Sequence, residues 1–485
     1  MIGRIFAGVF SLTVAAVVPA GAAVAEPSSV SGGDRPVYVT NADSADISTF
    51  ATDVTTGRPV LTDKKLAPAG RGVRQMTFTP DGRTAFAANP DVVIGPDRHG
   101  TISVYQVGPH GRLTPKETVG SGGETPLGVA VALDGRTLYV ANVFGKTVVA
   151  FRIAADGSIK QFRTFPVTIN NPRGLALSPD GRFLYLSYGD NTDDRPTSVG
   201  GISTFAIGRD GGLTEVGPPV RVGRFDATMA ITADGRYLYV DSTDTDQVFG
   251  FAIGSDGRLA PLPRSPYDVS DWPEGITVTP DGRFVYVASV GLSTEDGPGY
   301  VTGFAIGTDG SLTPVAKPFR ADLFPVGITV VPSGRFVYVS GGFDAGRLSA
   351  FAIGAGGKLV PLAGTPFDTG GFDPAYSSIT VGPNQGPVAG FAAGADGRSV
   401  TFDASASADP DGSVATYAWD FGDGATQTTT KPRTTHRYLG PGTFRATLTV
   451  TDDEGCSTAV VSTGQGVLCD GSAAAGLTRD VVVSG

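Results

Sequence analysis

Short runs that alternate hydrophobic and polar residues, separated by glycine-rich turns, dominate the chain from residue 34 onward. Residues 275–278 and 284–288 are two such runs, and Asp281-Gly282 lies between them. An Asp-Gly pair supplies the positive φ that a tight hairpin needs, so these runs predict two antiparallel strands. No segment has the 3.6-residue period of an amphipathic helix. The pattern therefore predicts an all-β protein.

The hairpin turn recurs six times, at Asp81, Asp134, Asp180, Asp234, Asp281 and Ser333. The repeat length is about 50 residues, which is typical of β-propellers and solenoids. Each copy continues into a third strand, a second turn such as Asp256-Gly257, and a short fourth strand. A four-stranded sheet of this size cannot bury both of its faces, so the copies must stack.

The two ends of the repeat region complete one further copy. Residues 376–383 have the pattern of a first strand without its partner, and residues 37–41 have that of a second strand without a predecessor. Pairing them closes a ring and removes the exposed sheet edges. The sequence therefore predicts a seven-bladed β-propeller over 37–386, closed by N- and C-terminal strands.

The repeats resemble a known family. Val37-Tyr38-Val39-Thr40-Asn41, residues 138–142 and the Pro-Asp-Gly-Arg turns are similar to those of the YVTN-repeat, lactonase-like seven-bladed propellers. In lactonase-like enzymes one blade usually reads Pro-Arg-His before its first strand and carries a Glu after its second. Here Arg173 is followed by Gly174, and the second strand ends in Tyr188-Gly189-Asp190, so the resemblance transfers only Arg173.

A second domain is expected over 387–485. The alternating strand 399–407, the run Trp419-Asp420-Phe421-Gly422-Asp423-Gly424 and the strand 444–452 closely resemble PKD-type domains, which are Ig-like β-sandwiches. Cys456 and Cys469 fall inside the predicted last hairpin. In an exported protein we expect them to form a disulfide, worth about 3 kcal/mol by loop entropy.

The N-terminus has the features of an export signal. Residues 5–18 are apolar, Ala23-Val24-Ala25 offers small residues to a signal peptidase, and cleavage is expected after Ala25. Residues 26–36 would then be a linker. We expect a secreted, extracellular protein of bacterial composition, without a membrane span and monomeric.

Charge and composition remove several functions. The formal charge is −10 and the 37 basic residues form no run, which disfavours nucleic acid and anionic membranes as partners. Three His and two Cys exclude a cysteine zinc cluster. No cofactor is required by the sequence, although Ca²⁺ is left open.

One propeller face concentrates the acidic residues. The loops before the first strands and between the second and third strands share that face and are its variable part. The loops between the second and third strands carry the acidic residues Asp43, Asp46, Asp91, Asp97, Asp190, Asp193, Asp194, Asp241, Asp244, Asp246, Glu295, Asp296 and Asp344. Asp241, Asp244 and Asp246 form the densest candidate for a Ca²⁺ site. The alternative is that these aspartates are solvated turn formers.

The loops that lead into the first strands provide the candidate chemistry. They carry Glu124, Arg173, Asp226, Trp272, Glu274 and Asp373, around the expected channel mouth. These side chains suit a sugar or a lactone. Hydrolysis needs a base, for which Glu274 or Glu124 is suitable, and a donor to the oxyanion, for which Arg173 is suitable. The alternative is an ordinary ion pair at the rim.

Two functions follow. The first is a secreted or cell-surface binding protein that uses the propeller rim for a glycan or protein ligand, with the PKD-type domain as spacer or adhesion module. The second is an exported hydrolase of an unphosphorylated lactone. Loss of the family's His and Glu favours the first.

Overall fold

The structure is a computed structural model that describes residues 35–63, 65–90, 99–189, 200–223, 226–291, 299–321, 324–342 and 345–484, without the side chains of 226 and 227. The expected signal peptide (1–25) and most of the linker lie outside these residues. So do eight of the rim acids: Asp91, Asp97, Asp190, Asp193, Asp194, Glu295, Asp296 and Asp344. Within the described residues no helix has the length and apolarity needed to cross a membrane.

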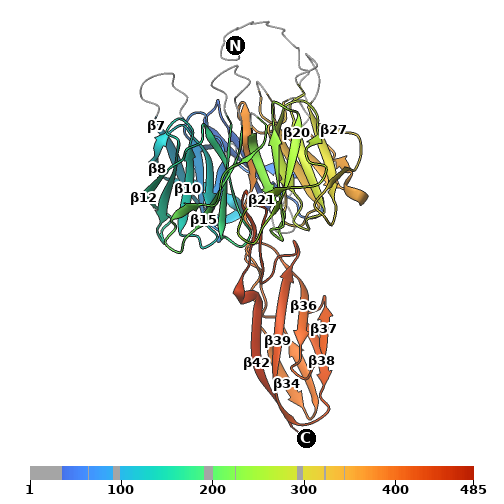
Figure 1. The fold of residues 1–485 in the computed structure, drawn as a ribbon. Coiled ribbons are helices and arrows are strands. Elements are labelled where there is room, and N and C mark those ends of the chain that lie inside the picture. The colour runs from blue at the N-terminus through green and yellow to red at the C-terminus, as the bar shows by residue number, and fades with distance from the viewer. Residues whose placement is uncertain are drawn as a thin grey trace. The chain divides into compact units, whose positions relative to one another are not determined.

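Seven small antiparallel sheets make up residues 35–381, as predicted (Figure 1). The innermost strands are β5 (Met76–Phe78), β9 (Pro126–Val131), β13 (Pro172–Leu177), β18 (Asp226–Ile231), β23 (Pro273–Val278), β28 (Gly327–Val330) and β33 (Pro374–Val381). The second strands are β6 (Thr84–Asn89), β10 (Thr137–Asn142), β14 (Phe183–Tyr188), β19 (Tyr237–Ser242), β24 (Phe284–Ser289), β29 (Phe336–Gly341) and β1 (Arg35–Asn41).

The outer half of each blade follows the same order. The third strands are β7 (His99–Val107), β11 (Thr147–Ile153), β15 (Gly201–Ile207), β20 (Gln247–Ile253), β25 (Tyr300–Ile306), β30 (Arg347–Ile353) and β2 (Asp46–Thr52). The outer strands are β8 (Leu113–Glu124), β12 (Ile159–Pro166), β16 (Leu213–Glu215), β21 (Leu259–Pro261), β26 (Leu312–Pro314), β31 (Leu359–Pro361) and β3 (Pro59–Leu61). Five two-residue strands also pair with third strands: β4 (Ala67–Pro68), β17 (Val220–Arg221), β22 (Tyr267–Asp268), β27 (Phe319–Arg320) and β32 (Phe367–Asp368). The short helices η2 (Pro109–Gly111) and η3 (Ala355–Gly357) are turns between third and outer strands.

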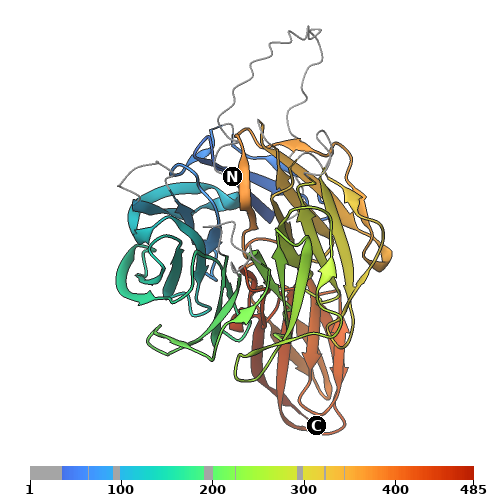
Figure 2. The same cartoon turned by 45° about the horizontal axis from the view of Figure 1, so that its top comes forward.

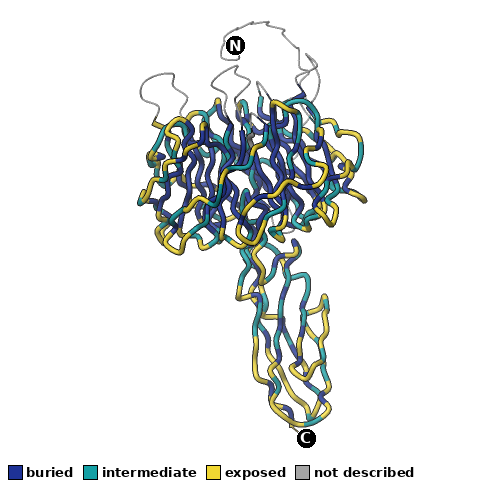
Figure 3. Tube along the Cα trace, viewed as in Figure 1, coloured by how far each residue is buried: buried dark blue, intermediate teal, exposed yellow. Residues whose placement is uncertain are grey.

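The ring closes through the two ends of the repeat region, and this confirms the prediction. β33 pairs antiparallel with β1, with Val381 opposite Val37 and Ile379 opposite Val39. Figure 2 shows the orange β33 beside the blue N-terminal strands. Each innermost strand contacts the next one around the ring, and β33 contacts both β28 and β5. The buried positions fill the innermost and second strands, whereas outer strands such as β8 and β12 are mainly exposed or half-buried (Figure 3).

Tyrosines of the second strands join successive blades. Each of six hydroxyls donates to a glycine carbonyl in the turn between the third and outer strands of the following blade, at 2.6–3.2 Å. The donors are Tyr38, Tyr139, Tyr185, Tyr239, Tyr286 and Tyr338. The bond from Tyr338 to Gly57 crosses the closure, so it links the last complete blade to the composite one.

The C-terminal part is an Ig-like sandwich, as predicted. One sheet has the order β34 (Ala392–Asp396), β35 (Ser399–Asp403), β38 (Arg433–Arg437), and the other β37 (Thr426–Thr429), β36 (Val414–Asp420), β39 (Gly442–Asp452), β42 (Gly476–Val483). The short helix η4 (Ala473–Ala475) precedes β42. Trp419 is 2% exposed and packs its ring 5.2 Å from Phe391 and 5.3 Å from Phe402. These alternating inward side chains form the sandwich core.

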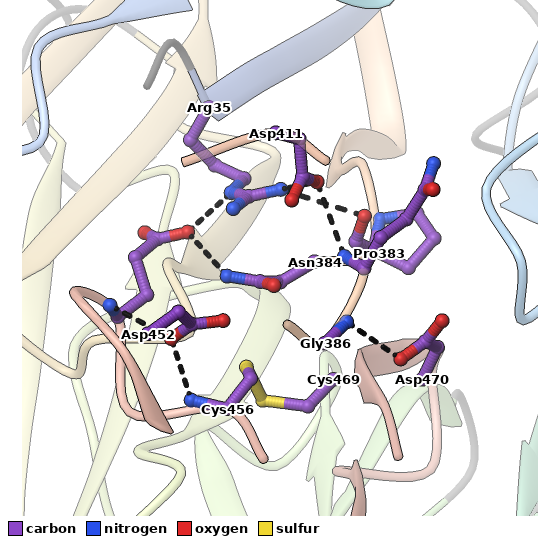
Figure 4. Close-up of a disulfide and its surroundings, with 11 residues drawn as sticks. Arg35, Pro383, Asn384, Gly386, Asp411, Asp452, Cys456, Cys469 and Asp470 are labelled. Carbon is purple, nitrogen blue, oxygen red and sulfur yellow. Dashed lines mark hydrogen bonds and ion pairs between the residues drawn. A yellow bond between two sulfur atoms is a disulfide. The ribbon is translucent and has the colours of Figure 1, made fainter. Parts of the chain in front are cut away.

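The predicted disulfide between Cys456 and Cys469 is present. It closes a hairpin, β40 (Val460–Ser462) and β41 (Val467–Asp470), that forms a sheet of its own and joins neither sandwich sheet. The Cys456 amide donates to Asp452 at 2.8 Å (Figure 4). The hairpin therefore leaves the sandwich from a fixed base.

A buried ion pair lies next to this disulfide (Figure 4). Arg35, at the start of β1, is 2% exposed; its guanidinium donates to Glu454 and, at 2.8 Å, to Asp411. Burial opposes the charge of Arg35, but the two carboxylates outweigh burial and hold its pKa above the ordinary value. Glu454 also accepts from Asn384 at 3.0 Å.

Candidate functional site

Three charged side chains occupy the same position in three alternate blades. Arg74, Arg173 and Glu274 each stand five residues before the Thr or Ser that opens the first hairpin turn. Arg173 and Glu274 are the second residues of β13 and β23, while Arg74 lies just before β5. The charges of both arginines act on the Glu274 carboxyl, so both arginines lie within electrostatic range of it.

The turn that leads into each of these strands fixes where the side chains start. Asn171 and Trp272 precede the prolines that open β13 and β23, and both have a positive φ, 47° and 60°. Their carbonyls accept from the chain after the second strand of the same blade, Asn171 from Gly189 at 3.4 Å and Trp272 from Val290 at 3.0 Å. These hydrogen bonds therefore fix where β13 and β23 begin on the predicted functional face.

Glu274 has the environment of a general base. Burial raises the pKa of its carboxyl above the ordinary value; the hydrogen bond from Trp272 and the charges of Arg173 and Arg74 oppose this shift. The indole Nε1 of Trp272 donates to Oε1 of Glu274 at 2.8 Å. The backbone N–H of Trp272 donates to Asp246 at 2.7 Å, which holds the tryptophan in place. The carboxyl is thus oriented and partly desolvated.

The arginines supply positive charge beside this carboxyl. Arg173 is 8% exposed. The Arg74 guanidinium lies 5.2 Å from the ring centre of Tyr376 on β33, and its Nε is buried without a hydrogen-bond partner among the described residues. A buried arginine donor that lacks a partner favours an acceptor oxygen from a ligand. Two cations around one carboxylate suit a developing oxyanion.

The structure brings together only part of the predicted set. Trp272 is hydrogen-bonded to Glu274, and the charge of Arg173 acts on the same carboxyl, as described above. Glu124 is the last residue of β8 and stands opposite His99. Asp373 precedes β33 with a φ of 47°, and its carbonyl accepts from Ala42 at 3.1 Å. The side chain of Asp226, the first residue of β18, lies outside the described part.

The candidate calcium loop uses its carboxylates within the fold. Asp241 is fully buried and accepts from the amide and hydroxyl of Thr228 at 2.8 and 2.6 Å. Asp244 accepts from Ser242 at 3.2 Å, and Asp246 from Trp272. The described ranges contain no group of three or more His, Cys, Asp or Glu placed to hold a metal ion. Calcium binding here stays a prediction that these contacts do not favour.

Sequence reasoning missed Arg74 and Tyr376. The prolines before Arg173 and Glu274 mark their blades, whereas Val73 stands at that position in the blade of Arg74. The signal that finds Arg74 is its offset from the turn, which equals that of the other two residues. Tyr376 has no such signal, because β33 contains extra residues and an irregular register between Val39 and Asn41 of β1.

Comparisons with known proteins agree with this architecture. Residues 36–173 match the family described as lactonase, 7-bladed beta-propeller, and residues 383–465 match the PKD domain. The resemblance to lactonase-like propellers followed by a PKD-type domain is therefore confirmed.

The relatives divide between the two parts of the chain. A 6-phosphogluconolactonase of Serratia proteamaculans is 26% identical over 317 residues, which are 56% of this chain and 93% of that protein. A microbial collagenase of Vibrio alginolyticus is 45% identical over 67 residues, which are 14% of this chain and only 8% of the collagenase. The solved structure of a periplasmic gluconolactonase of Pseudomonas aeruginosa is 21% identical, with a TM-score of 0.59 over 72% of this chain and 98% of its own; this likeness shows the fold alone.

Proposed function

We propose that this protein hydrolyses a lactone at the mouth of the propeller channel, with Glu274 as the base and Arg74 and Arg173 as the cationic groups. The observation that carries the proposal is that these three side chains stand at equivalent positions of alternate blades and that the charges of both arginines act on Glu274. The lactonase relatives support it over the binding role expected from the sequence. The missing His and Glu of the usual pattern are then replaced by Glu274 from another blade.

The chemistry of the site follows from these roles. Glu274 accepts a proton from a water molecule, whose oxygen attacks the lactone carbonyl carbon. The carbonyl oxygen becomes negative and is stabilised by the arginines. The ring C–O bond then breaks, and the proton held by Glu274 passes to the departing alkoxide. The product is an open hydroxy acid, which releases one proton to the solvent at neutral pH.

The substrate we propose is an unphosphorylated sugar lactone or aryl lactone outside the cytoplasm. The relatives include a periplasmic gluconolactonase, and the disulfide suits an oxidising compartment. The expected export signal agrees with this location, as does a rim whose carboxylates would repel a phosphate group.

Proton release by the purified protein tests this proposal. Hydrolysis of unphosphorylated sugar lactones and aryl lactones above the spontaneous rate is expected, and Glu274→Gln should lower it by about 10²-fold or more. Glu124→Gln is the matched control: it removes a carboxylate that the sequence also offered as base, and it should leave the rate unchanged. An active Glu274→Gln variant would place the base elsewhere.

If the protein hydrolyses none of these lactones, the binding role becomes the favoured function. The next measurement would then be a titration of the protein with glycans and with calcium, in which the change in Trp272 fluorescence reports binding at the acidic rim. Binding without turnover would fit a propeller that keeps the lactonase fold but serves as a ligand-binding module.

A further inference from the structure

The disulfide hairpin of residues 456–469 contacts the propeller from inside its ring of innermost strands. The amide of Leu177 donates to the Gly464 carbonyl at 2.9 Å, and the amide of Ile231 to the Thr463 carbonyl at 2.8 Å. The side-chain amide of Gln465 donates to the Ile276 carbonyl at 3.0 Å. The tip of one hairpin therefore bonds to β13, β18 and β23, which belong to three successive blades.

These contacts show from which face the hairpin enters. Leu177 and Ile231 are the last residues of β13 and β18, directly before the first hairpin turns. Arg173 stands at the opposite end of β13, four residues earlier, or about 13 Å along an extended strand. The hairpin thus enters from the turn face, and the candidate site opens on the other face.

The innermost strands offer the hairpin a row of backbone groups. The channel-side edge of such a strand has no neighbour in its own sheet, so its N–H and C=O groups need partners. The hairpin supplies two carbonyls and one side-chain donor to this edge. It acts here as a short extra strand for two blades.

The fit at the tip depends on one glycine. Gly464 has a φ of 88°, and a Cβ built on it would lie 3.0 Å from Ile231 and 3.3 Å from Ala176. Two residues further on, a Cβ on Gly466 would meet nothing within 4 Å. The close packing against the inner strands therefore requires glycine at position 464, whereas position 466 has room for a side chain.

Little space remains around the tip. A cavity of about 40 Å³ is lined by the hairpin residues Thr463, Gln465 and Gly466 together with Gly275, Thr277 and Gly327 of the inner strands. That is room for about three water molecules and too little for a sugar ring.

We propose that the disulfide hairpin is a plug that makes the propeller channel one-ended and forms the floor beneath the site at the mouth. The plug anchors β23 through Ile276, two residues after Glu274, so Gln465 is a positioning residue for the strand that carries the base. The C-terminal domain is then a part of the site's scaffold. The consequence for catalysis rests on the proposed function, whereas the plug itself does not.

Hydrogen exchange of the full protein tests the plug without any substrate. The amides of Leu177 and Ile231 should exchange as slowly as amides paired within the sheets, because the hairpin carbonyls hold them. Gly464→Ala should speed both by about tenfold or more, and the matched Gly466→Ala should leave both within about twofold of the wild type. Rapid exchange in the wild type, or equal exchange in the two variants, would overturn the plug.

A second route covers a Gly464→Ala protein that does not fold. Reduction of the Cys456–Cys469 disulfide in the wild type frees the base of the hairpin, and the same two amides should then exchange faster. Alkylation of both thiols verifies that the disulfide has been opened. If the two amides stay protected in that protein, the proposal is also overturned.

Kinetics separate the floor from a purely structural role. Gln465→Met keeps the side-chain length and adds no charge but cannot donate to Ile276, so water reaches Glu274 from below and the acid limb of the kcat/KM profile should move to lower pH. Gly466→Ala should not move it. An unchanged limb in Gln465→Met would refute the positioning role. If no lactone is hydrolysed, the exchange result still decides the plug, so failure of the two proposals can be told apart.

Discussion

At the scale of single residues, Trp272 both orients Glu274 and tunes its acidity. Its indole N–H donates to the carboxylate, and this bond opposes the upward effect of burial on the pKa of Glu274. A base must be deprotonated to accept a proton from water, so activity should rise with pH through the pKa of Glu274. Because that pKa lies above the ordinary glutamate value, the acid limb of the kcat/KM profile should also lie above that value.

Replacing Trp272 with Phe tests this relation. Phe keeps an aromatic ring but removes the donor, so the pKa of Glu274 should rise further and the acid limb of kcat/KM should move to higher pH. The measurement is the pH dependence of lactone hydrolysis, with Tyr300→Phe, an aromatic change in the third strand of the same blade, as control. A limb that moved to lower pH would contradict the role given to the indole.

The residue scale is also where sequence reasoning was weakest. Arg173 and Glu274 could be selected because the repeat pattern placed both in segments that lead into inner strands. The action of Arg173 and Arg74 on Glu274 could not be foreseen from any local motif, since the three residues lie in separate repeats about 100 residues apart, two repeat lengths. The ring sets the distance in space between one repeat and another. Residues that stand at the same position of their repeats therefore come near one another only once the number of blades is fixed.

At the scale of elements, the strands and turns were predictable because each signal is local. Asp-Gly between two alternating runs specifies a hairpin whatever surrounds it. The partial copies at the two ends gave the β1–β33 pairing in the same way. The position of the disulfide hairpin was not accessible, because residues 463–465 bear no mark of the strands, some 190 to 290 residues earlier, that they contact.

The tyrosine bonds between blades give an element-scale prediction. Tyr286→Phe removes the 2.8 Å bond to Gly357 and leaves a buried carbonyl without its donor. The free energy of unfolding should fall by about 1–3 kcal/mol. Denaturant unfolding checks this, with Tyr300→Phe as control because that ring is half-buried and outside the set of turn-bonded tyrosines. A loss equal to that of the control would mean that water replaces the hydroxyl.

At the scale of the whole molecule, the Arg35–Glu454 pair ties the first strand of the propeller to the C-terminal domain. Glu454→Gln leaves the buried guanidinium with Asp411 as its remaining carboxylate, and should cost about 3 kcal/mol of unfolding free energy. Arg236→Gln breaks an ion pair with Asp234 whose side chains are 61% and 47% exposed, and should cost under about 1 kcal/mol. Equal losses in the two variants would show that the buried pair carries no special weight.

A second whole-molecule property is the dependence of stability on pH. Burial, with the charges of Asp411 and Asp452, raises the pKa of Asp409 to about 7, and burial raises that of Asp452 to about 6. Both carboxyl groups bind protons more tightly in the folded protein, so their contribution is fully present below about pH 4, the unfolded value, and is lost as the pH rises through 6 and 7. Asp156 and Asp403, whose pKa values are lowered to about 2 by hydrogen bonds, act in the opposite sense and protect the fold above about pH 4.

Thermal unfolding should therefore give a higher Tm at pH 5 than at pH 8. In Asp409→Asn the amide cannot ionise, so the fall in Tm between these pH values should become smaller; a slope as steep as that of the wild type would exclude Asp409 as its source.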